Sequence, residues 1–143
     1  DGGAGIPGSV DAGRRVDSLD QLYAQAACVH PVLLAKTRAW AVASGGLFPA
    51  GDDSEGFVPY GGDDSEGPGA AKFARLKAVS RSVEKVVRSY GQDTSLLVDV
   101  CRQSIAFDTA AGLADCLQAV CDDSEAELVR VKNRLPPPPP PAQ

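Results

Sequence analysis

The pattern of apolar and polar positions predicts helices on both sides of a polar central stretch. The first helical pattern begins at Ser18, which fits a capping box with Gln21. Pro31 interrupts this pattern, so we expect a break or kink near His30 and a second helical piece over residues 31–44. The apolar positions that carry the periodicity are Leu19, Leu22, Tyr23, Ala26, Leu33 and Trp40.

Helical spacing resumes after the central stretch and continues almost to the C-terminus. An apolar stripe over residues 70–90 predicts one helix, and Gly91 is a natural residue to end it. A further helix is expected near residues 93–105. Asp108-Thr109 is an N-cap signal for a last helix, in which a heptad-like apolar seam extends to Leu135. Whether residues 93–134 form two helices or one bent helix stays open at this level.

The central stretch, residues 45–69, is an acidic low-complexity insert. The string Gly-Asp-Asp-Ser-Glu-Gly occurs in it twice, and residues 41–71 contain no Lys or Arg. Six carboxylates in the insert exceed the whole formal net charge of −5, so the rest of the chain carries +1. We interpret the repeat as a solvated loop because neither copy has the alternating ligands of a calcium loop. The six acidic residues are Asp52, Asp53, Glu55, Asp63, Asp64 and Glu66.

The amino-acid composition favours an all-α fold and marks an extension at each end of the sequence. The apolar residues are mainly Ala, Val and Leu, which suit closely packed helices better than a sheet. Residues 1–16 form a Gly-rich arm, and residues 136–143 form a polyproline II tail. The expected architecture is therefore an all-α bundle of about four helices over residues 17–135, with the acidic loop at 45–69.

The cysteines suggest a disulfide and no metal site. No Cys-x-x-Cys pair is present, and the single histidine has no obvious partner ligands. A turn at Asp108-Thr109 would place Cys101 and Cys116 at the same level of a helical hairpin, where they could form a disulfide. The alternative is that both are small buried hydrophobic residues.

One short segment resembles a known family. Leu113-Ala114-Asp115-Cys116-Leu117 is similar to the last helix of plant invertase and pectin methylesterase inhibitors, which are disulfide-linked four-helix bundles. The N-terminal cysteine pair of that family is absent, and Cys101 lies too close to Cys116 for its second bridge. The resemblance implies a secreted or lumenal inhibitor or binding module, which we keep as an alternative.

Two segments are candidate partner-binding sites. One is the apolar patch between the two acidic strings, and the other is the proline run, whose extended form suits the aromatic grooves of polyproline-binding modules. The proline run could equally act as a rigid spacer. The candidate residues are Phe57, Val58, Pro59 and Tyr60, together with Pro136, Pro137, Pro138, Pro139, Pro140 and Pro141.

These features predict a non-catalytic structural subunit of a larger protein assembly, which binds neighbours through helix faces and extended arms. We expect other protein subunits as partners, no cofactor, no nucleic acid and no transmembrane segment. A small enzyme or metal-binding protein is a further alternative. The chain begins at Asp1 and contains no Met. This start is compatible with a processed organellar or secreted chain, or with a fragment, so the compartment is left open.

Overall fold

The part of the chain that the structure describes contains three α-helices, a short 3-10 helix and a two-stranded antiparallel sheet, so the predicted all-α bundle of about four helices is wrong. A computed structural model describes residues 13–51, 56–62, 67, 69–137, 139 and 140. Both acidic repeats and most of the Gly-rich arm lie outside the described residues. The elements of the described part are α1, β1, β2, α2, η1 and α3 in chain order.

Helix α1 (Leu19–Ser44) is the longest element, and both of its ends were predicted correctly. The Ser18 hydroxyl accepts a hydrogen bond from the Gln21 amide (3.2 Å), and Gly45 ends the helix with a left-handed φ of 71°. The expected break near His30 is wrong, because α1 continues through Pro31 as one helix of 26 residues. A proline in the fourth turn removes one backbone donor, but the turns on either side hold the helix.

Strands β1 (Leu47–Pro49) and β2 (Phe57–Pro59) pair where an unstructured loop was expected. Phe48 in β1 is completely buried, and its ring lies 4.7 Å from the ring of Phe73. Tyr60 contacts the same Phe73 ring edge-on, and the Arg38 guanidinium of α1 stacks over both rings at 4.9 and 4.7 Å. These aromatic contacts attach the hairpin to α1.

Residues 70–78 are extended, and α2 (Val79–Ser89) is shorter than the predicted helix. The reason is a long-range contact with Gln103. Its side-chain amide accepts a hydrogen bond from the Ala74 amide (3.1 Å) and donates one to the Ala74 carbonyl (2.9 Å). Both backbone groups of Ala74 are thereby withdrawn from helical pairing. Gly91 follows α2 with a positive φ of 54°, as its position predicted.

The helix expected near residues 93–105 is reduced to the single turn η1 (Thr94–Leu96). The Asp93 carboxylate accepts hydrogen bonds from the amide and hydroxyl of Ser95, which fixes a local turn in place of a longer helix. Beyond it the chain is extended. Asp99 there accepts hydrogen bonds from Lys77 (2.9 Å) and Lys85 (2.8 Å) and ties this segment to α2.

Helix α3 (Ala110–Asp122) begins at the predicted cap, Thr109, whose hydroxyl accepts a hydrogen bond from the Gly112 amide. It ends at Asp122, so the predicted seam from Leu117 to Leu135 is wrong beyond that residue. Carboxylates at a helix C-terminus oppose the helix dipole, which disfavours continuation through Asp122 and Asp123. Of the residues after α3, those at 127–137 are exposed and belong to no helix or strand.

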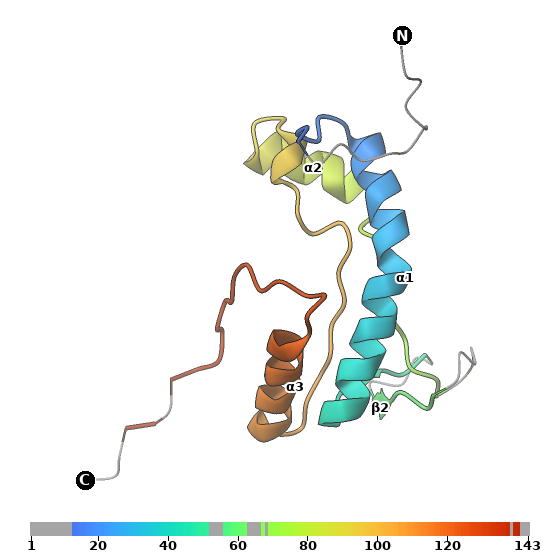
Figure 1. Cartoon of the computed structure of the whole chain (residues 1–143), viewed down its shortest axis with the longest axis vertical. Coiled ribbons are helices and arrows are strands. Elements are labelled where there is room, and N and C mark those ends of the chain that lie inside the picture. Colours follow the sequence, from blue (N-terminus) through green and yellow to red (C-terminus); the bar gives the residue numbers. More distant parts are fainter. Residues whose placement is uncertain (1–12, 52–55, 63–66, 68, 138, 141–143) are drawn as a thin grey trace.

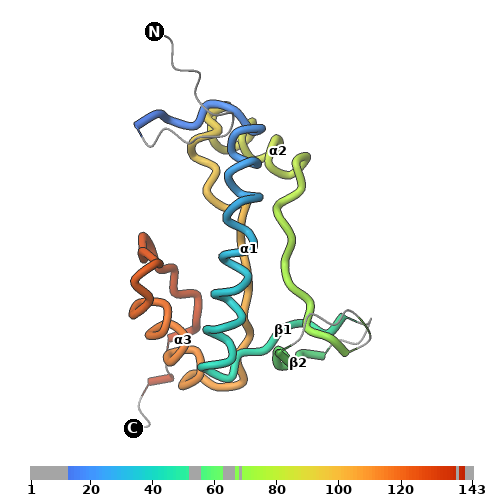
Figure 2. The backbone as a smooth tube through the Cα atoms, turned by 45° about the vertical axis from the view of Figure 1, so that its right-hand side comes forward, coloured from blue at the N-terminus to red at the C-terminus, as the bar shows by residue number. Residues whose placement is uncertain are grey.

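The elements are arranged along α1 as a spine (Figures 1 and 2). Helix α2 lies across the N-terminal end of α1, while the hairpin and α3 lie at its C-terminal end. The segment between η1 and α3 runs alongside α1. The buried cluster between α1 and α2 contains Ala26, Val86, Leu97 and Val100.

Candidate functional site

Helix α1 presents a mostly apolar surface to solvent, which we call its outer face. Only three side chains of its 26 residues carry a full charge: Asp20, Lys36 and Arg38. A helix that is apolar on all sides is normally enclosed by other elements. Here α2 lies at the N-terminal end of α1, and α3 and the hairpin flank its C-terminal end on different sides (Figures 1 and 2). The residues of α1 that they leave exposed form the outer face. The exposed apolar residues of α1 include Ala24, Ala27, Cys28, Val29, Pro31, Val32, Ala35, Ala39, Val42 and Ala43.

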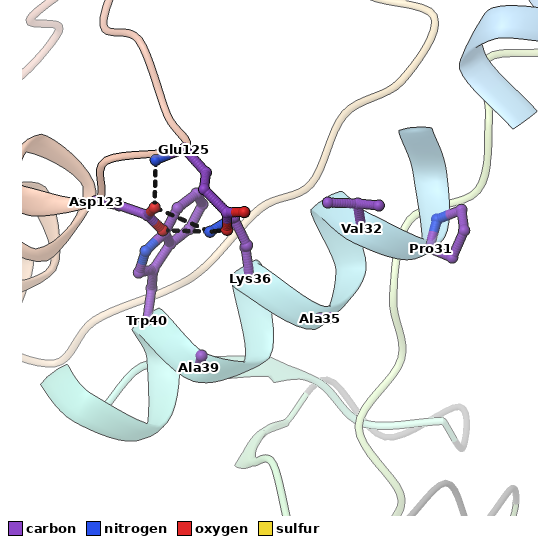
Figure 3. A pocket seen from close by; sticks show the side chains of 8 residues that line it. All are labelled: Pro31, Val32, Ala35, Lys36, Ala39, Trp40, Asp123 and Glu125. Atoms are coloured by element: carbon purple, nitrogen blue, oxygen red, sulfur yellow. Dashed lines mark hydrogen bonds and ion pairs between the residues drawn. The ribbon is translucent and has the colours of Figure 1, made fainter. Parts of the chain in front are cut away.

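A hollow of about 530 Å³ lies on this face, where α1 meets the end of α3. Figure 3 shows Pro31 and Val32 at one end and Trp40 at the other, with Lys36 between them. The hollow is an open groove, because Val32 is 56% exposed and its neighbours Ala35 and Ala39 are also exposed. Its lining residues are Pro31, Val32, Ala35, Lys36, Ala39, Trp40, Asp123 and Glu125.

An ion-pair cluster forms one wall of the groove (Figure 3). The Lys36 ammonium lies 2.7 Å from a carboxylate oxygen of Asp123 and 2.7 Å from one of Glu125. The Glu125 amide also donates a hydrogen bond to Asp123 (2.9 Å). The hydrogen bond between Lys36 and Asp123 shifts the pKa of both groups. It is the main cause that lowers the pKa of Asp123 and the main cause that raises the pKa of Lys36. Both groups therefore stay charged at neutral pH.

This arrangement is suited to binding and poorly suited to proton transfer. A general acid or base works best with a pKa near the working pH, whereas the pKa of Asp123 is shifted away from neutrality. The groove instead offers an aromatic ring, a row of small apolar side chains and a charged rim. Such a combination is typical of a surface that accepts an apolar segment with a charged flank.

His30 and Cys101 form a second contact that the sequence did not predict. The Cys101 thiol lies 4.0 Å from Nδ1 of His30, between the middle of α1 and the extended segment after η1. Burial raises the pKa of the Cys101 thiol, so it stays protonated at neutral pH. A nucleophilic cysteine needs a lowered pKa, and we therefore interpret the pair as a packing contact.

The structure does not bring the predicted disulfide pair into a helical hairpin. Cys101 lies in an extended segment, whereas Cys116 is buried in α3, and all four cysteines are free thiols. The hairpin of two helices, on which the disulfide hypothesis depends, is therefore not formed by these residues. Oxidation of Cys101 and Cys116 stays a prediction.

The two candidate binding segments differ in their surroundings. Phe57 and Pro59 in β2 are exposed, while Val58 is half-buried and Tyr60 packs on Phe73. Only part of the predicted apolar patch therefore faces solvent. In the proline run, Pro136, Pro137, Pro139 and Pro140 are exposed, and Pro138 and Pro141 lie outside the described residues. Partner binding by either segment stays a prediction.

Sequence reasoning missed the groove because its members are far apart in the chain. Asp123 and Glu125 belong to an Asp-Asp-Ser-Glu string at residues 122–125, which falls inside the last helix expected from the sequence. The structure places this string at the end of α3, where two of its carboxylates bind Lys36. The sequence contains one indication of this surface. Helix α1 is apolar on nearly all sides, whereas a helix with one solvated face normally carries polar residues there.

The chain matches no protein-family model, curated protein or solved structure with which it was compared. None of the described helices is both long enough and apolar enough to cross a membrane. Within the described residues, no three His, Cys, Asp or Glu side chains are grouped so that they could hold a metal ion.

Proposed function

We propose that this chain is a non-catalytic structural subunit of a larger protein assembly, and that the outer face of α1 is its main docking surface. The observation that carries the proposal is the exposure of an apolar face along a 26-residue helix, with the Trp40 groove at its centre. Burial of apolar side chains is the main source of stability in protein association.

The balance of buried and exposed apolar residues supports the same proposal. Among the described residues, only eight hydrophobic residues are buried, whereas fifteen large hydrophobic residues are exposed. Single exposed apolar residues are common on any protein. The exposed ones here, however, recur at helical spacing, as in Val79, Val83 and Val87 of α2. Contiguous apolar faces of this kind are characteristic of interaction surfaces.

The proposal is tested with a double substitution in the groove, Ala35→Glu with Ala39→Glu. Both side chains are exposed, so glutamate has room and the helix retains a good helix former. We expect the fold to persist and the partners of the tagged chain to be lost from material purified from the native source. The matched control is Ala111→Glu with Ala114→Glu, two exposed positions on α3.

The readout is quantitative mass spectrometry of co-purifying proteins, with circular dichroism to verify the fold. We expect the groove variant to lose its partners by about tenfold or more, because each buried charge costs several kcal/mol. Retention of the same partners by wild type, groove variant and control would contradict the proposal.

A further inference from the structure

The described part of the C-terminal segment, residues 127–137, is a second exposed surface, and its chemistry matches that of the groove. We call residues 128–137 the C-terminal arm. In Figure 1 it leaves the body of the protein after α3 and ends far from α1. Val129 in the arm is 89% exposed. Within the described structure, no hydrogen bond involves the backbone of residues 127–132.

Apolar and basic side chains alternate along the arm. Arg130, Lys132 and Arg134 occupy even positions, while Val129 and Val131 occupy odd ones. In an extended backbone, successive side chains point to opposite faces. The arm therefore has one basic face and one apolar face, and neither is covered by the chain itself. Leu135 and the first prolines extend the apolar character to its end.

The groove has the complementary charge. Lys36, Asp123 and Glu125 are the charged residues that line the groove, with a formal charge of −1, and the neighbouring Asp122 and Glu127 bring the charge of this region to −3. The arm carries +3 and contains no acidic residue. Opposite potentials of this kind select partners and fix their register.

The apolar parts also correspond. Val32, Ala35 and Ala39 offer a row of small contacts, and the Trp40 ring closes its end (Figure 3). Proline segments in the extended form dock on aromatic side chains with a low entropy cost. An extended segment of valines, basic residues and prolines is thus the type of ligand that this groove fits.

We propose that the occupant of the groove is the C-terminal arm of a second copy of this chain, in a dimer that exchanges the two arms reciprocally. This inference rests on the proposed function, since it names the partner of the same docking surface. A copy's own arm starts at Leu128, three residues after the groove rim at Glu125. In the structure this arm leads away from α1 (Figure 1), which leaves the groove open to the arm of another copy.

The size of the contact approaches that of a standard protein–protein interface. Each copy would contribute the ten residues of its arm and the eight residues that line its groove. The total of eighteen is close to the roughly 20–30 residues a side of a standard interface. Because the two copies exchange their arms reciprocally, the dimer contains two identical contacts between an arm and a groove.

The single tryptophan provides a direct readout. Sedimentation equilibrium of the full chain should give twice the 14.8 kDa of one copy. Dilution below the dissociation constant should shift the Trp40 emission to the red as the groove becomes hydrated. A monomer at all concentrations would overturn the inference.

Charge reversal of the arm tests the contact itself. The variant Arg130→Glu, Lys132→Glu, Arg134→Glu should be monomeric, with its dissociation constant raised about a hundredfold or more by like-charge repulsion. The matched control reverses three exposed basic residues elsewhere, Lys72→Glu, Arg75→Glu and Arg102→Glu, and should remain dimeric. A dimer that survives arm reversal would overturn the inference. The inference would also be overturned if the wild-type chain were a monomer and its Trp40 emission still changed on reversal of the arm charges. The arm of each copy would then occupy its own groove.

A charge swap distinguishes exchange from general loss of stability. Asp122→Lys with Glu127→Lys makes the groove region basic while leaving the Lys36 pairs with Asp123 and Glu125 intact. This variant and the arm-reversed variant should each be monomeric alone and should form a heterodimer when mixed. Two variants that stay monomeric in the mixture would overturn the inference. The proposed function would still stand if the wild-type monomer lost other partners on Ala35→Glu, Ala39→Glu substitution.

Discussion

At the scale of single residues, long-range polar contacts decide where the chain departs from local pattern. Gln103 holds both backbone groups of Ala74, and Lys36 holds Asp123 and Glu125. Each contact joins positions at least 29 residues apart, so no local window contains both partners. These contacts explain why residues 70–78 and 123–135 do not form the helices that their apolar spacing favours.

The Lys36 cluster predicts a specific dependence of stability on pH. The pKa of Asp123 is lowered in the folded protein, chiefly by its hydrogen bond from Lys36. Its stabilising effect is therefore complete above the unfolded aspartate pKa of about 3.9 and is lost as the pH falls through the folded value. We expect Asp123→Asn to lower the urea midpoint at pH 7, and this difference from wild type to shrink at pH 3.

The control for this variant is Asp115→Asn, an exposed position on α3, the helix that ends just before Asp123. We expect it to leave the urea midpoint almost unchanged at both pH values. A difference for Asp123→Asn that is as large at pH 3 as at pH 7 would show that its effect does not come from the ion pair.

Gly46, two residues after the end of α1, lies close to Ala41 of α1 and to the Ile105 side chain of the segment after η1. A Cβ atom added there would overlap the Ile105 side chain and lie 3.0 Å from the Ala41 Cα. We expect Gly46→Ala to lower the free energy of unfolding by about 1–3 kcal/mol, the usual cost of overpacking. Gly61→Ala is the matched control, since nothing lies within 4 Å of its added Cβ. Denaturation in urea measures both, and equal midpoints would contradict the packing account.

At the scale of elements, helix ends were predictable and helix lengths were not. Ser18, Gly45 and Thr109 cap helices as expected, because a cap acts within its own turn. The hairpin was missed because its strands are only three residues long and lie beside charged repeats. Phe48 and Phe73, which bury the hairpin, are 25 positions apart and give no joint local signal. The groove was missed for the same reason.

Pro31 offers a test of the long helix. A proline inside a helix costs up to about 3 kcal/mol relative to alanine, and α1 carries this cost at an exposed position on its outer face. We expect Pro31→Ala to raise the free energy of unfolding by about 1–3 kcal/mol and to leave the helical content measured by circular dichroism unchanged. A loss of stability would instead indicate that Pro31 is needed by the packed side of α1.

At the scale of the whole molecule, the distribution of apolar surface is the central observation. The packed clusters are small, while the groove, the valine stripe of α2 and the arm are exposed. A chain built in this way gains stability from partners as well as from its own core. We therefore regard the outer face of α1 as the feature that defines the protein's role.

Hydroxyl-radical footprinting of α1 tests this claim most directly. The measurement compares the oxidation of Val32 and Trp40 in the isolated chain, diluted until it is monomeric, with that in the assembly recovered from the native source. We predict that both residues are strongly protected in the assembly, while exposed Val98 between η1 and α3 is oxidised equally in both samples. Equal oxidation of Val32 and Trp40 in the two samples would contradict the account.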